Sequence, residues 1–264
     1  MNAAFLITFR EGLEAALIVG ILFAAMKALG AQKKNFVVWL GVLMGLFLSF
    51  VFAWAFATFT TGFEGATEKL YEGILMLVAA GIITHLIFWM RKEGKNITKN
   101  LKQKVKTHLD QGSLWMIGAL AAIAVAREGI ETVIFFQALF VQSGENISIL
   151  SGILGVVSAV VLACVIFFST RKVPVGKLFD YLSYFLILIA AGLIAHGVVE
   201  LQGANIIPTI IKPLYDLSTV LSEKEGLGAF LKAGFGYDAD PSLLAVLGYV
   251  LYLGVVLGLY RREA

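Results

Sequence analysis

The amino-acid sequence predicts an all-α integral membrane protein with seven transmembrane helices. Three observations lead to this fold class. Of the 264 residues, 59% are hydrophobic, the mean hydropathy is +0.87, and several apolar runs approach or exceed about 20 residues, the length that crosses a hydrocarbon layer. A soluble domain of this size could not bury so much apolar surface in one core.

The expected helices are the apolar runs between short polar connections. They are expected at residues 3–28, 36–60, 67–90, 114–142, 147–169, 178–201 and 242–260. The first run has no basic n-region and is interrupted by charged residues, so we expect a retained membrane helix rather than a cleaved signal peptide. The only cysteine, Cys164, excludes an intrachain disulfide and a metal site built from cysteines.

The distribution of Lys and Arg predicts the orientation, because cytoplasmic loops carry an excess of these residues. Fifteen of them lie in the C-terminal tail and in the connections after the first, third and fifth expected helices, whereas the opposite side holds four. The N-terminus should therefore lie outside and the C-terminus in the cytoplasm. No nucleic-acid-binding motif is present.

The sequence also contains an internal repeat. Residues 77–85 (LVAAGIITH) align with residues 188–196 (LIAAGLIAH). Each copy holds three expected helices, and an odd number places the second copy upside down in the membrane, as in many transporters. We therefore expect an inverted 3+3 repeat plus a seventh helix.

The expected organisation is a single transmembrane domain over residues 1–264. Its parts are repeat 1 at about 1–91, a basic cytoplasmic linker at about 92–112, repeat 2 at about 113–201, an outer loop at about 202–241 and helix 7 at about 242–261. The linker is expected to form a helix near anionic lipid.

One charged pentapeptide occurs twice inside apolar runs, as Arg10-Glu11-Gly12-Leu13-Glu14 and as Arg127-Glu128-Gly129-Ile130-Glu131. A charged residue at the centre of a membrane helix costs roughly 2.5–3.5 kcal/mol on insertion scales, so such residues indicate function. The doubled motif therefore predicts two halves of one ion-binding site.

Helical spacing puts both glutamates of each motif on one face, with the arginine one turn from the second glutamate. Inverted pairing of the two helices brings Glu11, Glu14, Glu128 and Glu131 together. Carboxylates suit hard or borderline cations such as ferric iron, manganese, calcium or magnesium, and an arginine orients them without competing as a ligand. The alternative is that each Arg–Glu pair is a structural salt bridge, which the additional acid in each motif argues against.

Other side chains are weaker candidates for an entry site. His196 and Glu200 share a helix face, as an entry site or as a structural hydrogen-bonded pair. His85, at the equivalent position in repeat 1, is expected to be a buried core histidine. Three acids recur every four residues where the outer loop enters the third helix, where they attract cations or form a solvated face; they are Glu64, Glu68 and Glu72.

The paired motif, in the first and fourth of seven expected helices, resembles the high-affinity iron permeases of oxidase-dependent iron uptake. The resemblance covers nearly the whole chain. It implies a multi-pass permease of the plasma membrane, the inner membrane in a bacterium, that imports iron and is not an enzyme. It also implies that the motif glutamates contact iron, that no prosthetic group is bound, and that a separate ferroxidase or periplasmic iron-handling partner delivers the iron; an oligomer is compatible with it.

Two other functions stay open from the residues alone. One is transport of another heavy or divalent cation, such as lead or manganese. The other is an intramembrane di-iron redox enzyme, because four carboxylates can hold two irons in a helical bundle. Those bundles add histidines in Glu-x-x-His motifs, which both copies here lack.

Overall fold

The computed structural model describes residues 3–60, 62–93, 97–143, 149–168, 175–223 and 226–262, and within these ranges every regular element of secondary structure is a helix. The all-α fold class is therefore confirmed. The long helices are α1 (Ala3–Ala28), α2 (Phe36–Thr60), α3 (Ala66–Glu93), α5 (Leu114–Ser143), α6 (Ile149–Phe168), α7 (Val175–Gly203) and α9 (Leu243–Arg262). The short ones are η1 (Gln32–Lys34), α4 (Ile97–Asp110) and α8 (Gly226–Phe235).

Five of the described helices are long and apolar enough to cross a membrane: α2, α3, α6, α7 and α9. The two other long helices, α1 and α5, have 26 and 30 residues, so their length is also sufficient. They differ from the five because each carries the three charges of one pentapeptide motif. Some cations that supported the predicted orientation, such as Lys95, Arg171 and Lys172, lie outside the described residues.

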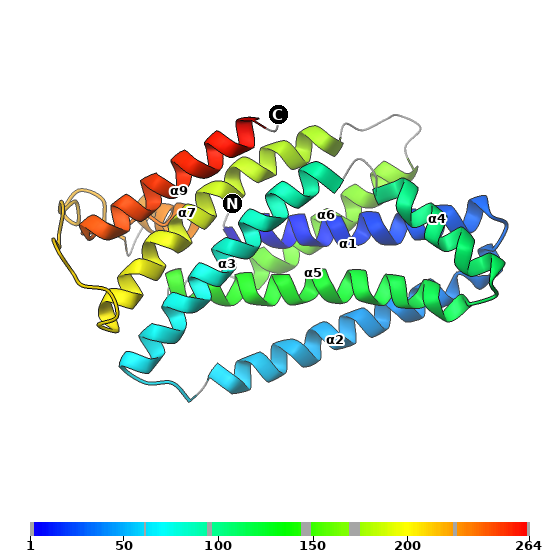
Figure 1. Cartoon of the computed structure of the whole chain (residues 1–264), viewed down its shortest axis with the longest axis horizontal. Helices are drawn as coiled ribbons and strands as arrows, with labels where there is room; N and C mark the ends of the chain where they lie inside the picture. The colour runs from blue at the N-terminus through cyan, green and yellow to red at the C-terminus, as the bar shows by residue number, and fades with distance from the viewer. Residues whose placement is uncertain are drawn as a thin grey trace.

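The long helices pack in pairs. α2 packs mainly on α5, α1 on α6, and α3 on α7, while α1 and α5 contact each other less extensively. Figure 1 shows α1 and α5 across the middle of the molecule, and α3, α7 and α9 as a layer that crosses them obliquely. The two motif-bearing helices therefore lie at the centre, each with a partner helix of its own.

Small residues allow the close approach within these pairs. A Cβ atom on Gly45 of α2 would lie 2.7 Å from the Ala122 carbonyl oxygen of α5, and one on Gly155 of α6 would lie 2.6 Å from the Phe5 carbonyl oxygen of α1. Neither distance leaves room for a side chain. The α2–α5 and α1–α6 pairs are thus held at backbone contact, as is common in membrane helix packing.

The two ends of the bundle differ. α4 lies at one end, which we call the α4 end, and packs against α1 and α5 through the fully buried Val105. α8 and the loop around it lie at the other, the α8 end, against α5 and α7. The predicted linker thus contains a helix, which buries its apolar face on the protein. The helix α8 in the outer loop is a structural addition to the seven expected helices.

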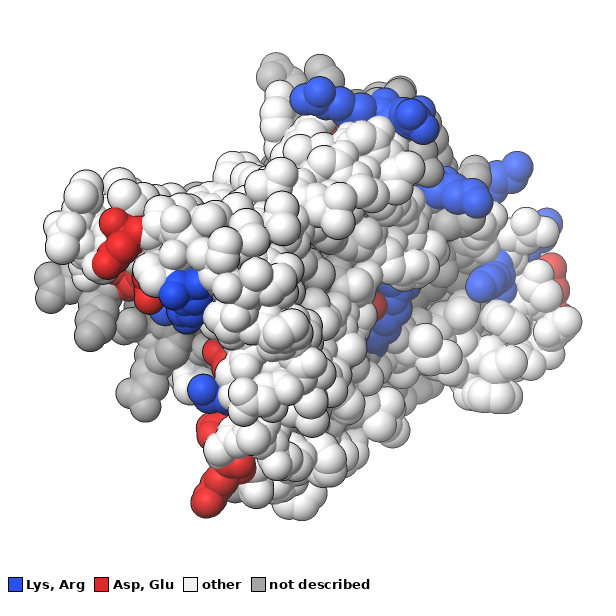
Figure 2. All heavy atoms as spheres, turned by 60° about the vertical axis from the view of Figure 1, so that its left-hand side comes forward, with Lys and Arg blue, Asp and Glu red and all other residues white. Residues whose placement is uncertain are grey.

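Between its ends the molecule presents a mostly uncharged surface. Figure 2 shows Lys, Arg, Asp and Glu gathered toward the ends, with white residues over the middle of the face. One blue and red group is the exception, because it lies in a hollow within the uncharged middle. An uncharged belt of this kind is what contact with lipid requires.

Candidate metal centre

The first motif is buried as a unit on α1. Arg10 is 3% exposed and lies between two acids of its own helix, with Nη1 2.6 Å from Glu11 Oε1 and Nη2 2.8 Å from Glu14 Oε1. Both acids are also fully buried, at 1% and 4% exposure. Because the guanidinium group presents a planar fork of donors, it fixes both carboxylates at once.

The second motif has a different environment on α5. Arg127 donates from Nε to Glu131 Oε1 at 2.9 Å, and among the described residues it forms no hydrogen bond or ion pair with Glu128. Its side chain is 37% exposed, and its guanidinium carbon lies 4.7 Å from the centre of the Trp89 ring on α3. Glu128 is buried and Glu131 is 13% exposed. The arginine therefore holds only one of its two acids.

Acids of both motifs meet between α1 and α5. Carboxylate oxygens of Glu11, Glu128 and Glu131 all lie within 4.8 Å of one another. Each of these residues has a buried Oε2 atom with no hydrogen-bond partner. Unpaired buried carboxylate oxygens are unfavourable, and a multivalent cation with oxygen ligands satisfies them. We call Glu11, Glu128 and Glu131 the carboxylate triad.

Glu14 lies beside the triad rather than in it. Its Oε1 is ion-paired with Arg10, which also holds Glu11. Glu14 is therefore linked to the triad through Arg10, the guanidinium group that it shares with Glu11. The sequence grouped all four glutamates as equivalent, whereas the geometry separates three neighbours from one supporting acid.

Buried apolar side chains, which we call the apolar plugs, lie along the helices on both sides of the triad. Toward the α8 end, Ile7 of α1 and Phe135 of α5 are fully buried in one cluster. Toward the α4 end, Leu22 of α1 and Ile117 of α5 are fully buried in another, which Val105 of α4 joins. The charged turns thus lie between two apolar plugs.

The glycine in each motif packs against a different helix. A Cβ on Gly12 would lie 3.2 Å from the Ala159 Cβ of α6, whereas one on Gly129 would collide with the Ser49 side chain of α2. Close helix approach at these glycines agrees with the expectation. These close contacts lie between each motif helix and its partner helix, however, and not between the two motif helices.

The three acids around the start of α3 are far from both motifs in the sequence. Glu64 and Glu68 are exposed, and Glu72 is partly buried within electrostatic reach of Glu200 and Lys69. Glu200 also faces lysines, namely Lys69 and Lys212. Acids and lysines are therefore mixed at this end of α3 and α7.

The two histidines differ from the expectation in one respect. His85 is exposed on α3, so the predicted buried core position is wrong. α3 packs on α7 with another face of the helix, which leaves His85 at the surface. His196 is partly buried, and its Nδ1 lies 3.2 Å from the Gly192 carbonyl oxygen of its own helix. Its contact is thus within α7, and among the described residues no hydrogen bond joins it to Glu200.

Two side chains on α5 or in contact with it were not singled out from the sequence. Trp89 resembles an ordinary interfacial tryptophan in the sequence, and only its ring contact with Arg127 marks it. Gln142 lies three and four turns beyond the α5 glutamates; its buried Nε2 donates to the Lys232 carbonyl oxygen of α8 at 3.1 Å. The spacing of 11 and 14 residues from Glu131 and Glu128 could have indicated that it shares their helix face.

A second acidic cluster lies in the loop at the α8 end, formed by Glu223, Asp238 and Asp240. Burial raises the pKa of Asp238 to about 6. Burial also acts on Glu223, but hydrogen bonds from the Ala239 N–H and the Lys232 ammonium hold its pKa below the ordinary value. A lysine already neutralises this cluster in part, unlike the triad.

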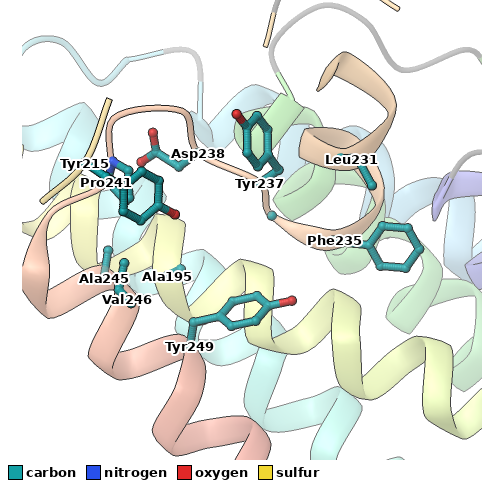
Figure 3. Close-up of a pocket in the computed structure, with 11 residues that line it drawn as sticks. Ala195, Tyr215, Leu231, Phe235, Tyr237, Asp238, Pro241, Ala245, Val246 and Tyr249 are labelled. Carbon is teal, nitrogen blue, oxygen red and sulfur yellow. The ribbon is translucent and has the colours of Figure 1, made fainter. Parts of the chain in front are cut away.

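A pocket of about 270 Å³ lies beside this loop cluster, between α7, α9 and the residues around α8. Figure 3 shows its aromatic lining, with Tyr215, Tyr237 and Tyr249 on different segments and Asp238 at its edge. None of the motif residues lines it. With a single carboxylate in a mainly apolar and aromatic wall, it lacks the oxygen set that the triad offers.

Comparison with known proteins finds one family over almost the whole chain. The model of the iron permease FTR1 family matches residues 1–260. The chain is 36% identical to the ferrous iron permease EfeU of Yersinia pestis over 96% of this chain and 90% of that protein. It is 34% identical to EfeU of Escherichia coli O6:K15:H31, over 96% and 92%. No solved structure matches.

A helical membrane protein with charged turns at the centre of its bundle belongs to the class of ion transporters. More specifically, the chain belongs to the iron permease FTR1 family. It is therefore a transporter and not an enzyme, a multi-pass protein of the plasma membrane, and iron is its transported substrate.

Proposed function

We propose that this permease imports iron in its ferrous form, by binding it at the carboxylate triad of α1 and α5. The observation that carries the proposal is the meeting of Glu11, Glu128 and Glu131 from two helices, each with an unpartnered buried oxygen. The ferrous state follows the name given to the relatives. Glu14 and the two arginines support the triad, and a separate oxidase or iron-delivery protein supplies the ion.

The transmembrane arrangement in this proposal has seven spans, α1, α2, α3, α5, α6, α7 and α9, with the α8 end outside and the α4 end in the cytoplasm. The helix packing supports an inverted repeat. In such a repeat, α1, α2 and α3 correspond to α5, α6 and α7. The α1–α6 pair then corresponds to the α5–α2 pair, and the α3–α7 pair corresponds to itself. These three pairs make the most extensive helix contacts among the described residues. Repeats of this kind hold their site near the membrane centre.

Transport then requires each apolar plug to open in turn. The plug of Ile7 and Phe135 separates the triad from the outside, and that of Leu22, Ile117 and Val105 separates it from the cytoplasm. Since the α1–α6 and α2–α5 pairs are tightly packed and the α1–α5 contact is looser, movement of one pair against the other opens the plugs alternately while both motifs stay intact.

The test is metal binding and uptake by purified protein. Glu128→Gln in nanodiscs should lose ferrous iron binding in an anaerobic titration, and in proteoliposomes it should lose uptake. Glu68→Gln, which changes an exposed acid on α3, is the matched control and should keep both. Competition by manganese and lead measures selectivity for iron. Normal iron binding by a folded Glu128→Gln variant would rule the site out.

A further inference from the structure

The two motif arginines hold different positions although they have the same place in the same sequence pattern. Arg10 is fixed by two carboxylates and is 3% exposed. Arg127 has one carboxylate partner, through Nε, and is 37% exposed. Within the described residues, its Nη atoms form no hydrogen bond or ion pair with the motif acids. Its guanidinium head is therefore tethered at one point and otherwise free to turn.

Trp89 provides the position in which that head lies. The guanidinium carbon is 4.7 Å from the centre of the Trp89 ring, within the range of a cation–π contact, which contributes most when water is excluded. Trp89 is near the α4 end of α3, and α3 contacts α5 much less than it contacts α7. The head thus lies on the side of the triad that the helices cover least.

The place of Arg127 along α5 shows that this side is wet. Arg127 lies near the middle of a 30-residue helix, where a charged group exposed to hydrocarbon is strongly unfavourable and ordinarily faces a water-filled cavity. Since Glu131 is also the most exposed acid of the triad, the triad is most accessible past Arg127.

When the ion leaves, another positive charge must take its place among the carboxylates. The four motif glutamates with Arg10 carry a formal charge of −3, and a ferrous ion with Arg127 would make it neutral. Without the ion, buried carboxylates repel one another at short range. An arginine that turns inward from its Nε tether can reach the unpartnered Oε2 of Glu128, the next residue along α5. The equivalent pair of the first motif, Arg10 and Glu11, is in such a contact at 2.6 Å.

From these observations we propose that Arg127 is a mobile counter-charge, which rests on Trp89 while the triad holds iron and turns onto Glu128 as the ion leaves toward the cytoplasm. Arg10 is the fixed arginine that keeps the triad in shape. This inference rests on the proposed iron site. It assigns opposite effects to the two arginines, because one competes with the ion and the other organises its ligands.

The experiment compares Arg127→Gln, Arg127→Lys and Trp89→Leu, with Arg10→Lys as the matched variant of the fixed arginine. Ferrous iron Kd is measured in nanodiscs, and the maximum uptake rate in proteoliposomes. Arg127→Gln removes the competitor, so Kd should fall by about tenfold or more, while the uptake rate falls by a similar factor because release slows. Arg127→Lys keeps a positive charge, so its Kd and its uptake rate should lie between those of the unchanged protein and those of Arg127→Gln.

Trp89→Leu removes the resting place without removing the charge. Arg127 then spends more time on the triad, so iron binding should weaken about three- to tenfold while the uptake rate at saturating iron stays within about twofold. Arg10→Lys loses the double contact and should weaken binding and uptake together. A merely structural Arg127 would give this last pattern, so the split between Kd and rate identifies the counter-charge.

An unchanged or weakened Kd in folded Arg127→Gln overturns the inference. If Glu128→Gln abolishes binding in the same assay, the iron site stands and only the role of Arg127 falls. If Glu128→Gln binds iron normally, the site and the inference fall together. Should Arg127→Gln not fold, Trp89→Leu decides alone, and a Kd no weaker than that of the unchanged protein contradicts the proposal.

Discussion

The motifs on α1 and α5 have nearly the same sequence and different surroundings. On α1, α6 packs beside the motif and all three charged residues are buried. On α5, the neighbours are α2 and the oblique α3, and the arginine reaches a partly open surface. The α1 side of the site is therefore buried, whereas the α5 side has a partly exposed arginine.

This difference shows that two copies of one sequence motif need not have the same role in the site. A site enclosed equally on both sides would hold the ion but would have no exposed group through which to release it. A buried ion pair with two carboxylates favours a single geometry, whereas a half-exposed pair with one carboxylate is weak and exchangeable. The α1 motif is therefore suited to defining the site and the α5 motif to changing it.

The largest expected effect separates triad acids from the supporting acid. Glu11→Gln removes a triad oxygen and should lower iron binding by more than about 100-fold. Glu14→Gln acts through Arg10, and a group that only orients a ligand typically contributes about 10–100-fold. Titration of both variants in nanodiscs gives the ratio. Equal losses would mean that Glu14 is itself a ligand and that the first motif contributes two acids to the site.

The next largest effect concerns stability. Arg10→Gln leaves two buried carboxylates without their partner, which should destabilise the protein by about 3–5 kcal/mol. Arg127→Gln breaks one half-exposed pair and should cost about 1 kcal/mol or less. Thermal unfolding of both variants in the same detergent, without iron, measures the difference. Similar melting temperatures would show that the two motifs are equally rigid.

Much of the architecture could be predicted from the sequence, because the membrane restricts what a chain can do. Apolar runs of sufficient length must be helices, and helices are present in all seven expected ranges, with α1 and α2 at the expected bounds. Helical spacing also put the two glutamates of each motif on one face. These are local properties, and the motif on α5 follows from them as directly as that on α1.

Other features depend on contacts between distant segments, which spacing does not encode. The separation of Glu14 from the triad depends on how α1 and α5 approach each other, because only carboxylate oxygens of Glu11, Glu128 and Glu131 lie within 4.8 Å of one another among the described residues of the motifs. The contact between Arg127 and Trp89 depends on the tilt of α3. His85 was expected to be a buried core histidine, but it is exposed while its repeat equivalent, His196, is partly buried, because the corresponding faces of α3 and α7 have different neighbours.

A smaller effect concerns the motif glycines. Gly12→Ala meets the Ala159 Cβ at 3.2 Å, and the gain in helix propensity, about 0.5–1 kcal/mol, should largely offset this contact. Gly129→Ala meets the Ser49 Cβ at 2.6 Å and should destabilise by about 1–3 kcal/mol, as overpacking does. Thermal unfolding provides the measurement.

The double variant Gly129→Ala with Ser49→Gly is the control for this glycine, because it restores the space on α2. It should recover most of the lost stability, whereas Ser49→Gly combined with Gly12→Ala should recover none. If the double variant stays as unstable as Gly129→Ala alone, the Ser49 contact is not what limits the α2–α5 distance.

The smallest effect compares the acids of the triad with those of the loop at the α8 end. Glu223 there is already ion-paired with Lys232 at 2.7 Å, so Asp238→Asn should change iron uptake by less than about twofold. Its effect is on the loop itself. Burial raises the pKa of Asp238 from 3.8 to about 6, so the folded loop becomes less stable as the pH rises through this interval.

Asp238→Asn removes this penalty, which for a half-exposed group amounts to about 1 kcal/mol. Hydrogen exchange in residues 204–223 should therefore slow in the variant at pH 7.5 and change less at pH 4.5, once rates are corrected for intrinsic exchange. The same protection at both pH values would show that Asp238 is not the titrating group. A large loss of uptake would instead mean that the loop acids handle the ion, and that the contrast between paired loop acids and unpaired triad acids does not divide structure from transport.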